Sequence, residues 1–145
     1  MTTLKATVQP KPDTRQWIGL GALAATLAVV AVLAAQALAI ALWPDIALFK
    51  PLDSYARAAL FTIIPAFAAT ALFAWLARHR ADPERAFLGI AAVVLLLSFI
   101  PDYFLPVPDK TFLASSVAAF LHIVAAAVIV TVLVGGYRRF GPANR

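Results

Sequence analysis

The chain has 145 residues, of which 63% are apolar and only 13% charged, and its mean hydropathy is +0.88. Soluble domains are about 45–50% apolar, so this composition excludes an ordinary soluble domain and predicts an integral membrane protein. The net charge of +5 comes from 12 basic and 7 acidic residues, but the basic residues flank apolar runs, and we expect no nucleic-acid partner. The lack of cysteine excludes disulfides, thiol catalysis and cysteine-ligated metals.

Four segments are long and apolar enough to cross a membrane. A helix spans the ~30 Å apolar layer with about 20 residues, and the alternating segments typical of a membrane β-barrel do not occur in the sequence. We therefore predict an all-α membrane protein, an up-and-down bundle of four transmembrane helices. The predicted spans are 17–43, 57–78, 83–101 and 110–137, in a domain over 17–137 between an N-terminal tail (1–16) and a basic C-terminal tail (138–145).

Small residues recur at helical spacing in three of the predicted spans. In lipid, helices associate where small side chains let their backbones approach closely. This spacing predicts a compact bundle, because each such stripe can meet a neighbouring helix. The predicted packing residues are Gly21 and Ala25 in the first span, Ala66, Thr70 and Ala74 in the second, and Ala119 and Ala126 in the fourth.

The connections between spans carry capping and turn residues. Asp82, Pro83 and Glu84 supply an N-cap, a first-position proline and a first-turn acid, so the second and third spans should form a tight antiparallel hairpin. The connections over 44–54 and 101–110 are rich in proline and predict structured caps. We expect Asp109 to cap the fourth helix.

The basic residues are distributed unevenly between the two sides of the predicted bundle. Only Lys50, Arg57 and Lys110 fall on one side, and the other nine Lys and Arg residues fall in the two tails and in the loop after the second span. By the positive-inside rule both termini are expected in the cytoplasm, in a bacterial plasma membrane. Aromatic residues at both ends of the spans are predicted interface anchors: Trp17, Trp43, Tyr55, Trp75, Tyr103 and Tyr137.

Few polar residues lie at membrane depth. His122 falls about 11 residues into the fourth span, near mid-bilayer, and an ionisable residue there is a functional-site hypothesis. Ser98 and Asp102 are four residues apart and share a face if the helix continues through Pro101. The predicted intramembrane polar cluster is His122, Asp102, Ser98, Gln36, Ser115 and Thr62.

Three roles remain open for His122. A neutral imidazole that donates to Gln36 or Ser98 would only fix the register of the helices. Together with Asp102, His122 would form a proton relay or a vestibule site. As a single axial ligand it would bind a metal or pigment, but zinc and iron sites need three or four ligands, so we predict no intrachain metal site and no definite cofactor.

Motifs of catalysis are missing from the sequence. It contains no GxSxG, HExxH or P-loop motif. Ser115 lies seven residues before His122 on the same predicted helix, about 10 Å away along the axis, which is beyond hydrogen-bond reach. We therefore expect a protein that is not an enzyme.

Three short motifs carry a resemblance to a known family. They are Phe49-x-Pro51-Leu52, Leu97-Ser98-x-x-Pro101-Asp102 and Leu121-His122-x-Val124-Ala125-Ala126. From about Trp17 to Tyr137 the chain resembles an uncharacterised family of small bacterial four-span membrane proteins, classed as a domain of unknown function. The resemblance implies a four-helix membrane protein in which the Ser/Asp end of the third span and the histidine of the fourth belong together, and it implies no activity.

These observations favour a non-enzymatic accessory or scaffold subunit. Its expected partners are the lipid bilayer and either other protein subunits or further copies of itself. One alternative is an oligomeric small transporter or channel with an outer cavity formed by His122 and Asp102. Another is a binder of a membrane-soluble cofactor or pigment through His122.

Overall fold

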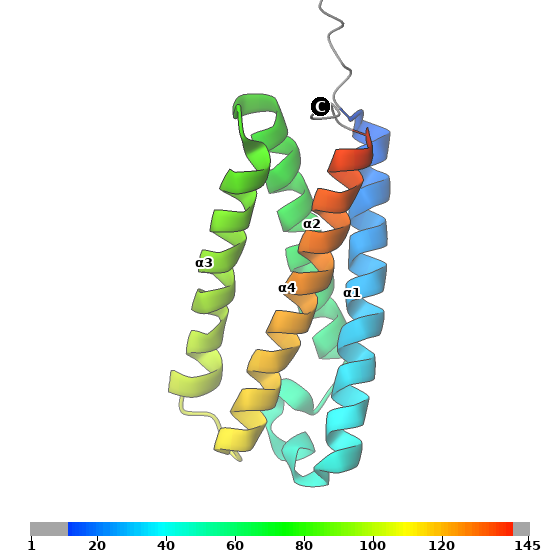
Figure 1. The fold of residues 1–145 in the computed structure, drawn as a ribbon. Coiled ribbons are helices and arrows are strands. Elements are labelled where there is room, and N and C mark those ends of the chain that lie inside the picture. The colour runs from blue at the N-terminus through cyan, green and yellow to red at the C-terminus, as the bar shows by residue number, and fades with distance from the viewer. Residues whose placement is uncertain (1–11, 141–145) are drawn as a thin grey trace, which may run out of the picture.

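Four long helices make up most of the structure, a computed structural model that describes residues 12–140 (Figure 1). They are α1 (Thr14–Leu42), α2 (Tyr55–His79), α3 (Pro83–Phe104) and α4 (Phe112–Phe140), and each is long and apolar enough to cross a membrane. Two short 3-10 helices, η1 (Pro44–Leu48) and η2 (Lys50–Leu52), connect α1 to α2. The prediction of an all-α four-helix bundle is confirmed. Most of the two predicted tails, 1–11 and 141–145, lies outside the described residues.

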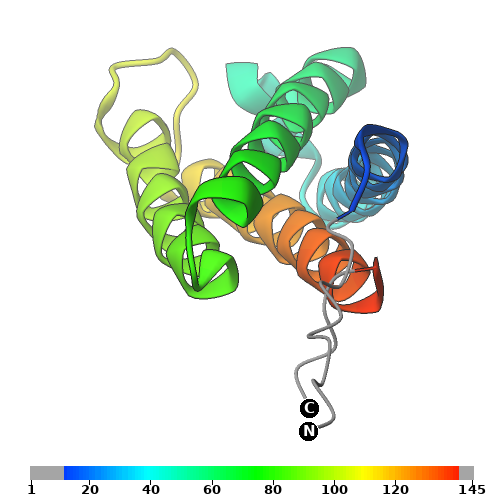
Figure 2. The same ribbon diagram turned by 90° about the horizontal axis from the view of Figure 1, so that it is seen from above.

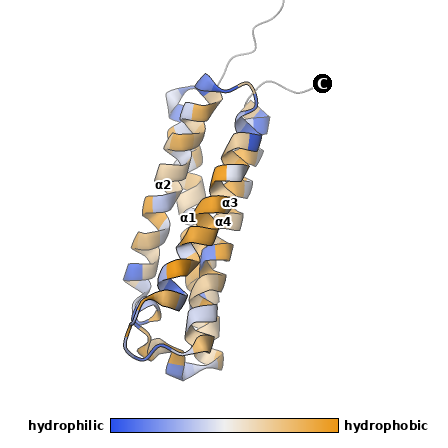
Figure 3. Cartoon of the chain, turned by 90° about the vertical axis from the view of Figure 1, so that its left-hand side faces the viewer, coloured by the Kyte–Doolittle hydropathy of each residue, from blue (hydrophilic) through white to orange (hydrophobic). Residues whose placement is uncertain are grey.

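The helices alternate in direction, so that α1 begins and α4 ends at the same end of the bundle (Figure 1). We call this the tail end; it also contains the short loop between α2 and α3. The opposite end, which we call the capped end, contains η1, η2 and the connection over 105–111. Hydrophilic residues gather at the two ends, and most of the length between them is apolar (Figure 3).

Side-chain caps fix where the helices begin. Asp13 forms a capping box with Gln16, because Gln16 N donates to Asp13 Oδ1 at 2.7 Å and Asp13 N donates to Gln16 Oε1 at 2.8 Å. Asp82 accepts from the backbone N–H of Arg85 at 3.2 Å and caps α3, as predicted.

At α4 the cap differs from the prediction. The backbone N–H of Ala114 donates to Thr111 Oγ1 at 3.0 Å, so Thr111 rather than Asp109 satisfies the first turn. Asp109 has a φ of 57°, a left-handed conformation that acidic side chains tolerate in turns. It therefore turns the chain just before the helix.

Helix α1 packs most extensively, against both α2 and α4, through small residues. A Cβ atom added at Gly21 would lie 3.1 Å from the side chain of Thr70 on α2, so little room is left for a side chain between these helices. Ala24, Ala28 and Ala66 are fully buried nearby. Of the other predicted packing residues, Ala25, Thr70 and Ala119 are buried, while Ala74 and Ala126 are half-buried.

Helix α3 lies at the edge of the bundle, beside α2 and α4 and away from α1 (Figure 2). Only 11% of its most apolar stretch is buried, compared with 39% for α4. At the tail end it is held by Phe87, whose ring stacks on Phe73 with centroids 4.4 Å apart, and by Glu84, whose carboxylate accepts from Arg138 Nη2 at 2.7 Å. Along its middle it is packed less closely.

An aromatic cluster closes the core at the tail end. Trp17 is only 5% exposed and contacts Phe73 edge-on and Tyr137 face-on, with centroids 5.5 Å and 6.1 Å apart. The ring of Trp17 therefore contributes to packing rather than to the lipid interface predicted for it. Trp43, Tyr55 and Trp75 are exposed near helix ends, and Tyr103 is half-buried.

The close approach of α1 and α2 predicts a position-specific effect of glycine substitution. Gly21→Leu would force a side chain against Thr70 and destabilise the bundle by about 1–3 kcal/mol, the range typical of overpacking. Gly19→Leu, two residues away, is the matched control because nothing lies within 4 Å of its Cβ position. Unfolding in sodium dodecyl sulfate, followed by circular dichroism, measures both; equal midpoints for the two variants would contradict the packing shown here.

Candidate functional site

Asp102 lies in the last turn of α3 and is buried, with 5% of its surface exposed. The helix continues through Pro101, so Ser98 and Asp102 lie one turn apart on the same face. On α4, Ser115 donates its hydroxyl to the carbonyl oxygen of Asp102 at 2.7 Å. This bond fastens the end of α3 to α4 and fixes the backbone from which the Asp102 carboxylate projects.

His122 of α4 faces that carboxylate. Its Nε2 lies 3.2 Å from Asp102 Oδ2, and the side chains are 44% and 6% exposed, respectively. Asp102 Oδ2 accepts no hydrogen bond from the residues that the structure describes. A buried carboxylate is costly unless it is paired and hydrogen-bonded, so His122 compensates Asp102 only in part. The carboxylate thus retains acceptor capacity for another donor.

The pair lies in the wall of a cavity of about 680 Å³ at the capped end. Residues of η2 and of all four long helices line it, and most of them are apolar. A second cavity of about 410 Å³ continues between α2, α3 and α4 toward the tail end. Both are lined by Phe61, Thr62, Ser98, His122 and Ala125, so they meet at the level of His122. We call the two cavities together the groove.

Two hydroxyl groups lie at this junction. Thr62 Oγ1 donates to the carbonyl of Ala58 at 2.8 Å, and Ser98 Oγ donates to the carbonyl of Leu95 at 2.7 Å. Each hydroxyl proton is therefore used within its own helix, while the oxygen lone pairs remain available as acceptors. Four residues of the predicted cluster thus line the groove: His122, Asp102, Ser98 and Thr62. A fifth, Ser115, binds the backbone carbonyl of Asp102.

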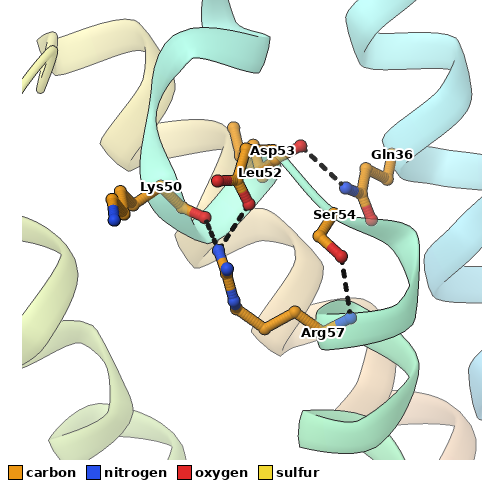
Figure 4. A network of polar contacts seen from close by, with 6 residues as sticks. All are labelled: Gln36, Lys50, Leu52, Asp53, Ser54 and Arg57. Atoms are coloured by element: carbon orange, nitrogen blue, oxygen red, sulfur yellow. Dashed lines mark hydrogen bonds and ion pairs between the residues drawn. The ribbon is translucent and has the colours of Figure 1, made fainter.

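Gln36, the remaining member of the predicted cluster, lies elsewhere. It is fully buried, and its Nε2 donates to the carbonyl oxygen of Leu52 at 3.0 Å (Figure 4). This bond fastens the connection between α1 and α2 to α1. Among the described residues, His122 donates no hydrogen bond to Gln36, whose Oε1 has no partner, or to Ser98, whose Oγ donates to Leu95.

Two cations at the capped end also line the groove. The guanidinium of Arg57 contacts the Asp53 carboxylate and the carbonyl oxygen of Lys50, whereas the ammonium of Lys50 extends away from this network (Figure 4). In the sequence, Lys50 and Arg57 served only to predict which end of the bundle faces the cytoplasm. The four-residue spacing of Asp53 and Arg57 suits an ion pair at a helix start, but no sequence pattern placed Lys50 in the same cavity wall as Asp102.

Metal binding by the groove has little support in the part of the chain that the structure describes. Over residues 12–140, no group of three or more His, Cys, Asp and Glu side chains is placed to hold an ion. His122 and Asp102 would supply two ligands, fewer than zinc sites use.

The contact between His122 and Asp102 predicts a measurable energetic coupling. We expect a double-mutant cycle of His122→Ala and Asp102→Asn to give about 1 kcal/mol, the upper end for exposed ion pairs, because the imidazole is partly exposed. Detergent unfolding measures the four stabilities. Thr131→Ala, at an exposed site on α4, replaces His122→Ala in the control cycle and should be additive with Asp102→Asn. Additivity within about 0.5 kcal/mol for both cycles would contradict the pairing.

Comparison with known proteins places this architecture in a family. No curated protein and no solved structure matches the chain. DUF6069, described as a family of unknown function, matches residues 12–139. The match covers nearly all of the described residues, from the cap of α1 to the end of α4. The family resemblance expected from the three motifs is confirmed, and this chain belongs to the DUF6069 family.

Proposed function

We propose that this four-helix membrane protein binds a membrane-soluble amphiphile in the groove. The observation that carries the proposal is the buried Asp102 carboxylate, contacted at 3.2 Å by His122 and free of hydrogen bonds from the described residues, in the wall of an apolar cavity of about 680 Å³. Ligand sites are typically concave spaces of about 300–1,000 Å³ with apolar walls and a few polar groups that orient the ligand. The groove has this composition.

Asp102 and His122 have complementary roles in this proposal. The carboxylate offers an acceptor to a hydroxyl or N–H group of the ligand, and the half-exposed imidazole offers a second polar contact beside it. An ionisable pair at membrane depth is costly to retain unless it is used. The apolar remainder of the ligand would lie along α2, α3 and α4, where the second cavity continues.

We further propose that the tail end faces the cytoplasm. Among the described residues, Arg15, Arg78, Arg80, Arg138 and Arg139 belong to helix ends or loops there, in keeping with the positive-inside rule. In a bacterial plasma membrane the capped end and the larger cavity would then lie in the outer leaflet. The amphiphile would be one that resides in, or passes through, that leaflet.

The proposal predicts that blocking the groove removes a bound small molecule. Ala125 lines both cavities, so Ala125→Phe would fill their junction, whereas Ala127→Phe, two residues away on an exposed face of α4, would not. Native mass spectrometry of protein drawn gently from its membrane should show ligand-sized adducts on the wild type and Ala127→Phe. We expect at least about a tenfold loss in Ala125→Phe, from overpacking of the site.

Two further variants complete this test. Ala125→Leu is a smaller block, for use if circular dichroism shows that Ala125→Phe has lost helix, and Asp102→Asn removes the charge but little volume. Equal adducts in the wild type and all groove variants would contradict the proposal. A transporter would also bind its cargo here, so amphiphile flux into proteoliposomes is measured in parallel; we expect none that depends on His122.

A second candidate is the accessory-subunit role expected from the sequence. The low burial of α3 favours this role, because only 11% of its most apolar stretch is buried. This helix also forms one side of the groove. A helix of another subunit, or of a second copy, would cover this face and close the groove from the side. Such contacts between helices are common where small or apolar faces meet in lipid.

Cross-linking from single cysteines tests this second candidate directly. Because the sequence has no cysteine, Val93→Cys on α3 and Leu27→Cys on α1 place one thiol each at exposed apolar positions. In native membranes we expect a discrete adduct from Val93→Cys and none from Leu27→Cys, and the mass of the adduct distinguishes a second copy from another polypeptide. If neither cysteine gives a protein adduct and both are cross-linked only to lipid, the result would contradict an accessory contact through α3.

A further inference from the structure

We infer that the amphiphile bound in the groove carries an anionic head group, such as a phosphate, and that Lys50 binds it at the capped end. This inference rests on the proposed function, since it names the class of ligand for the same groove. It follows from the position of Lys50, from the pairing of the other charges that line the groove, and from the order of polar and apolar surface along it.

Lys50 is held by its backbone while its side chain is free to bind. Its carbonyl oxygen accepts from the Arg57 guanidinium, and η2 is fastened to α1 by the bond from Gln36 to Leu52. Within residues 12–140, its ammonium group has no ion pair or hydrogen bond, and it extends away from Asp53 and Arg57 (Figure 4). The backbone of Lys50 is thus fixed at the cavity wall, and its exposed ammonium group is available to an anion.

Among the charged side chains that line the groove, Lys50 is the one without an ion-pair partner in the described structure. Arg57 is paired with Asp53, and Asp102 is in contact with His122. Lys50 is the other charged side chain that lines the 680 Å³ cavity in the described structure. An anionic head group is a ligand that would give the Lys50 ammonium group a partner.

Charged, polar and apolar surfaces follow one another along the groove in the order expected for an amphiphile with three parts. Lys50 lies at the end of the helices, at the depth where lipid head groups lie. Asp102 in the larger cavity and His122 at the junction of the two cavities follow, where a hydroxyl or ester region would lie. The second cavity, lined mostly by apolar residues of α2, α3 and α4, would receive the chain. A simple phosphate ion would use only the first of these three parts.

An unspecific interface lysine would also attract anionic lipid, and this alternative defines the experiment. Such a lysine would act on the surrounding bilayer and would be indifferent to whether the groove is open. Lys50 in a binding site acts on one lipid held in the groove. Preference for an anionic head group should therefore require both Lys50 and an unblocked groove.

The test titrates full-length protein in neutral detergent with dioleoyl lipids that differ only in head group, and counts bound lipid by native mass spectrometry. The lipids are phosphatidic acid, phosphatidylcholine and diacylglycerol, and glycerol phosphate is the competitor without chains. We expect the wild type to bind phosphatidic acid about tenfold more tightly than diacylglycerol, as for one charge-assisted contact. Lys50→Gln should lose this preference, while Lys50→Arg and Arg80→Gln, which changes the same charge at the tail end, should keep it.

Each other outcome overturns a stated part of the inference. If Ala125→Phe abolishes lipid binding but Lys50→Gln keeps the wild-type preference, the head-group inference fails and the amphiphile site stands. If Ala125→Phe and Ala125→Leu bind every lipid as the wild type does, the groove site fails and the inference fails with it. If glycerol phosphate displaces phosphatidic acid at equal concentration, the site recognises phosphate alone rather than a lipid.

Discussion

Helix α3 is fastened to the bundle at its two ends rather than along its length, and the rest of the site depends on this. At the tail end, Phe87 stacks on Phe73 and Glu84 pairs with Arg138. At the capped end, Ser115 binds the Asp102 carbonyl, and Tyr103 donates its hydroxyl to Ser116 at 3.2 Å. A helix packed along its whole length would fill the space that the groove occupies. Fixing only the ends leaves a cavity wall with a defined position.

The connections at the capped end show how irregular backbone is kept next to a membrane. Carbonyl groups outside regular helices need hydrogen-bond donors, because lipid supplies none. Long polar side chains provide them: Gln36 donates to Leu52, Arg57 to Lys50, and Lys110 to both Tyr103 and Leu105, at 3.0 Å and 2.9 Å. The residues that look most out of place in an apolar sequence thus have a structural role, with Lys50 and the pair of Asp102 and His122 as exceptions.

Length, charge and spacing along one helix predicted the helices, the capping by Asp82 and the shared face of Ser98 and Asp102; the family resemblance implied that His122 belongs with these two. The sequence did not predict the rotation of each helix. Helices α1 and α4 are apolar on all sides, so no amphipathic face shows which side meets a neighbour; Trp17 could thus be placed by depth but not by direction. The hydrogen-bond partner of Gln36 could not be predicted either, because it is a backbone carbonyl and every residue has one. The position of Lys50 could not be predicted either, because η2 is held by contacts between elements, from Arg57 and from Gln36.

The side of the groove is formed partly by exposed residues, among them Phe61 and Val94, which are 67% and 57% exposed. The proposed ligand would therefore enter by lateral diffusion between α2 and α3, without leaving the bilayer for water. For such a site the relevant concentration is a mole fraction of lipid, which is high even for a minor component. Modest intrinsic affinity would then be enough for occupancy. Exchange would depend on the local separation of two helices rather than on dissolution of an insoluble molecule.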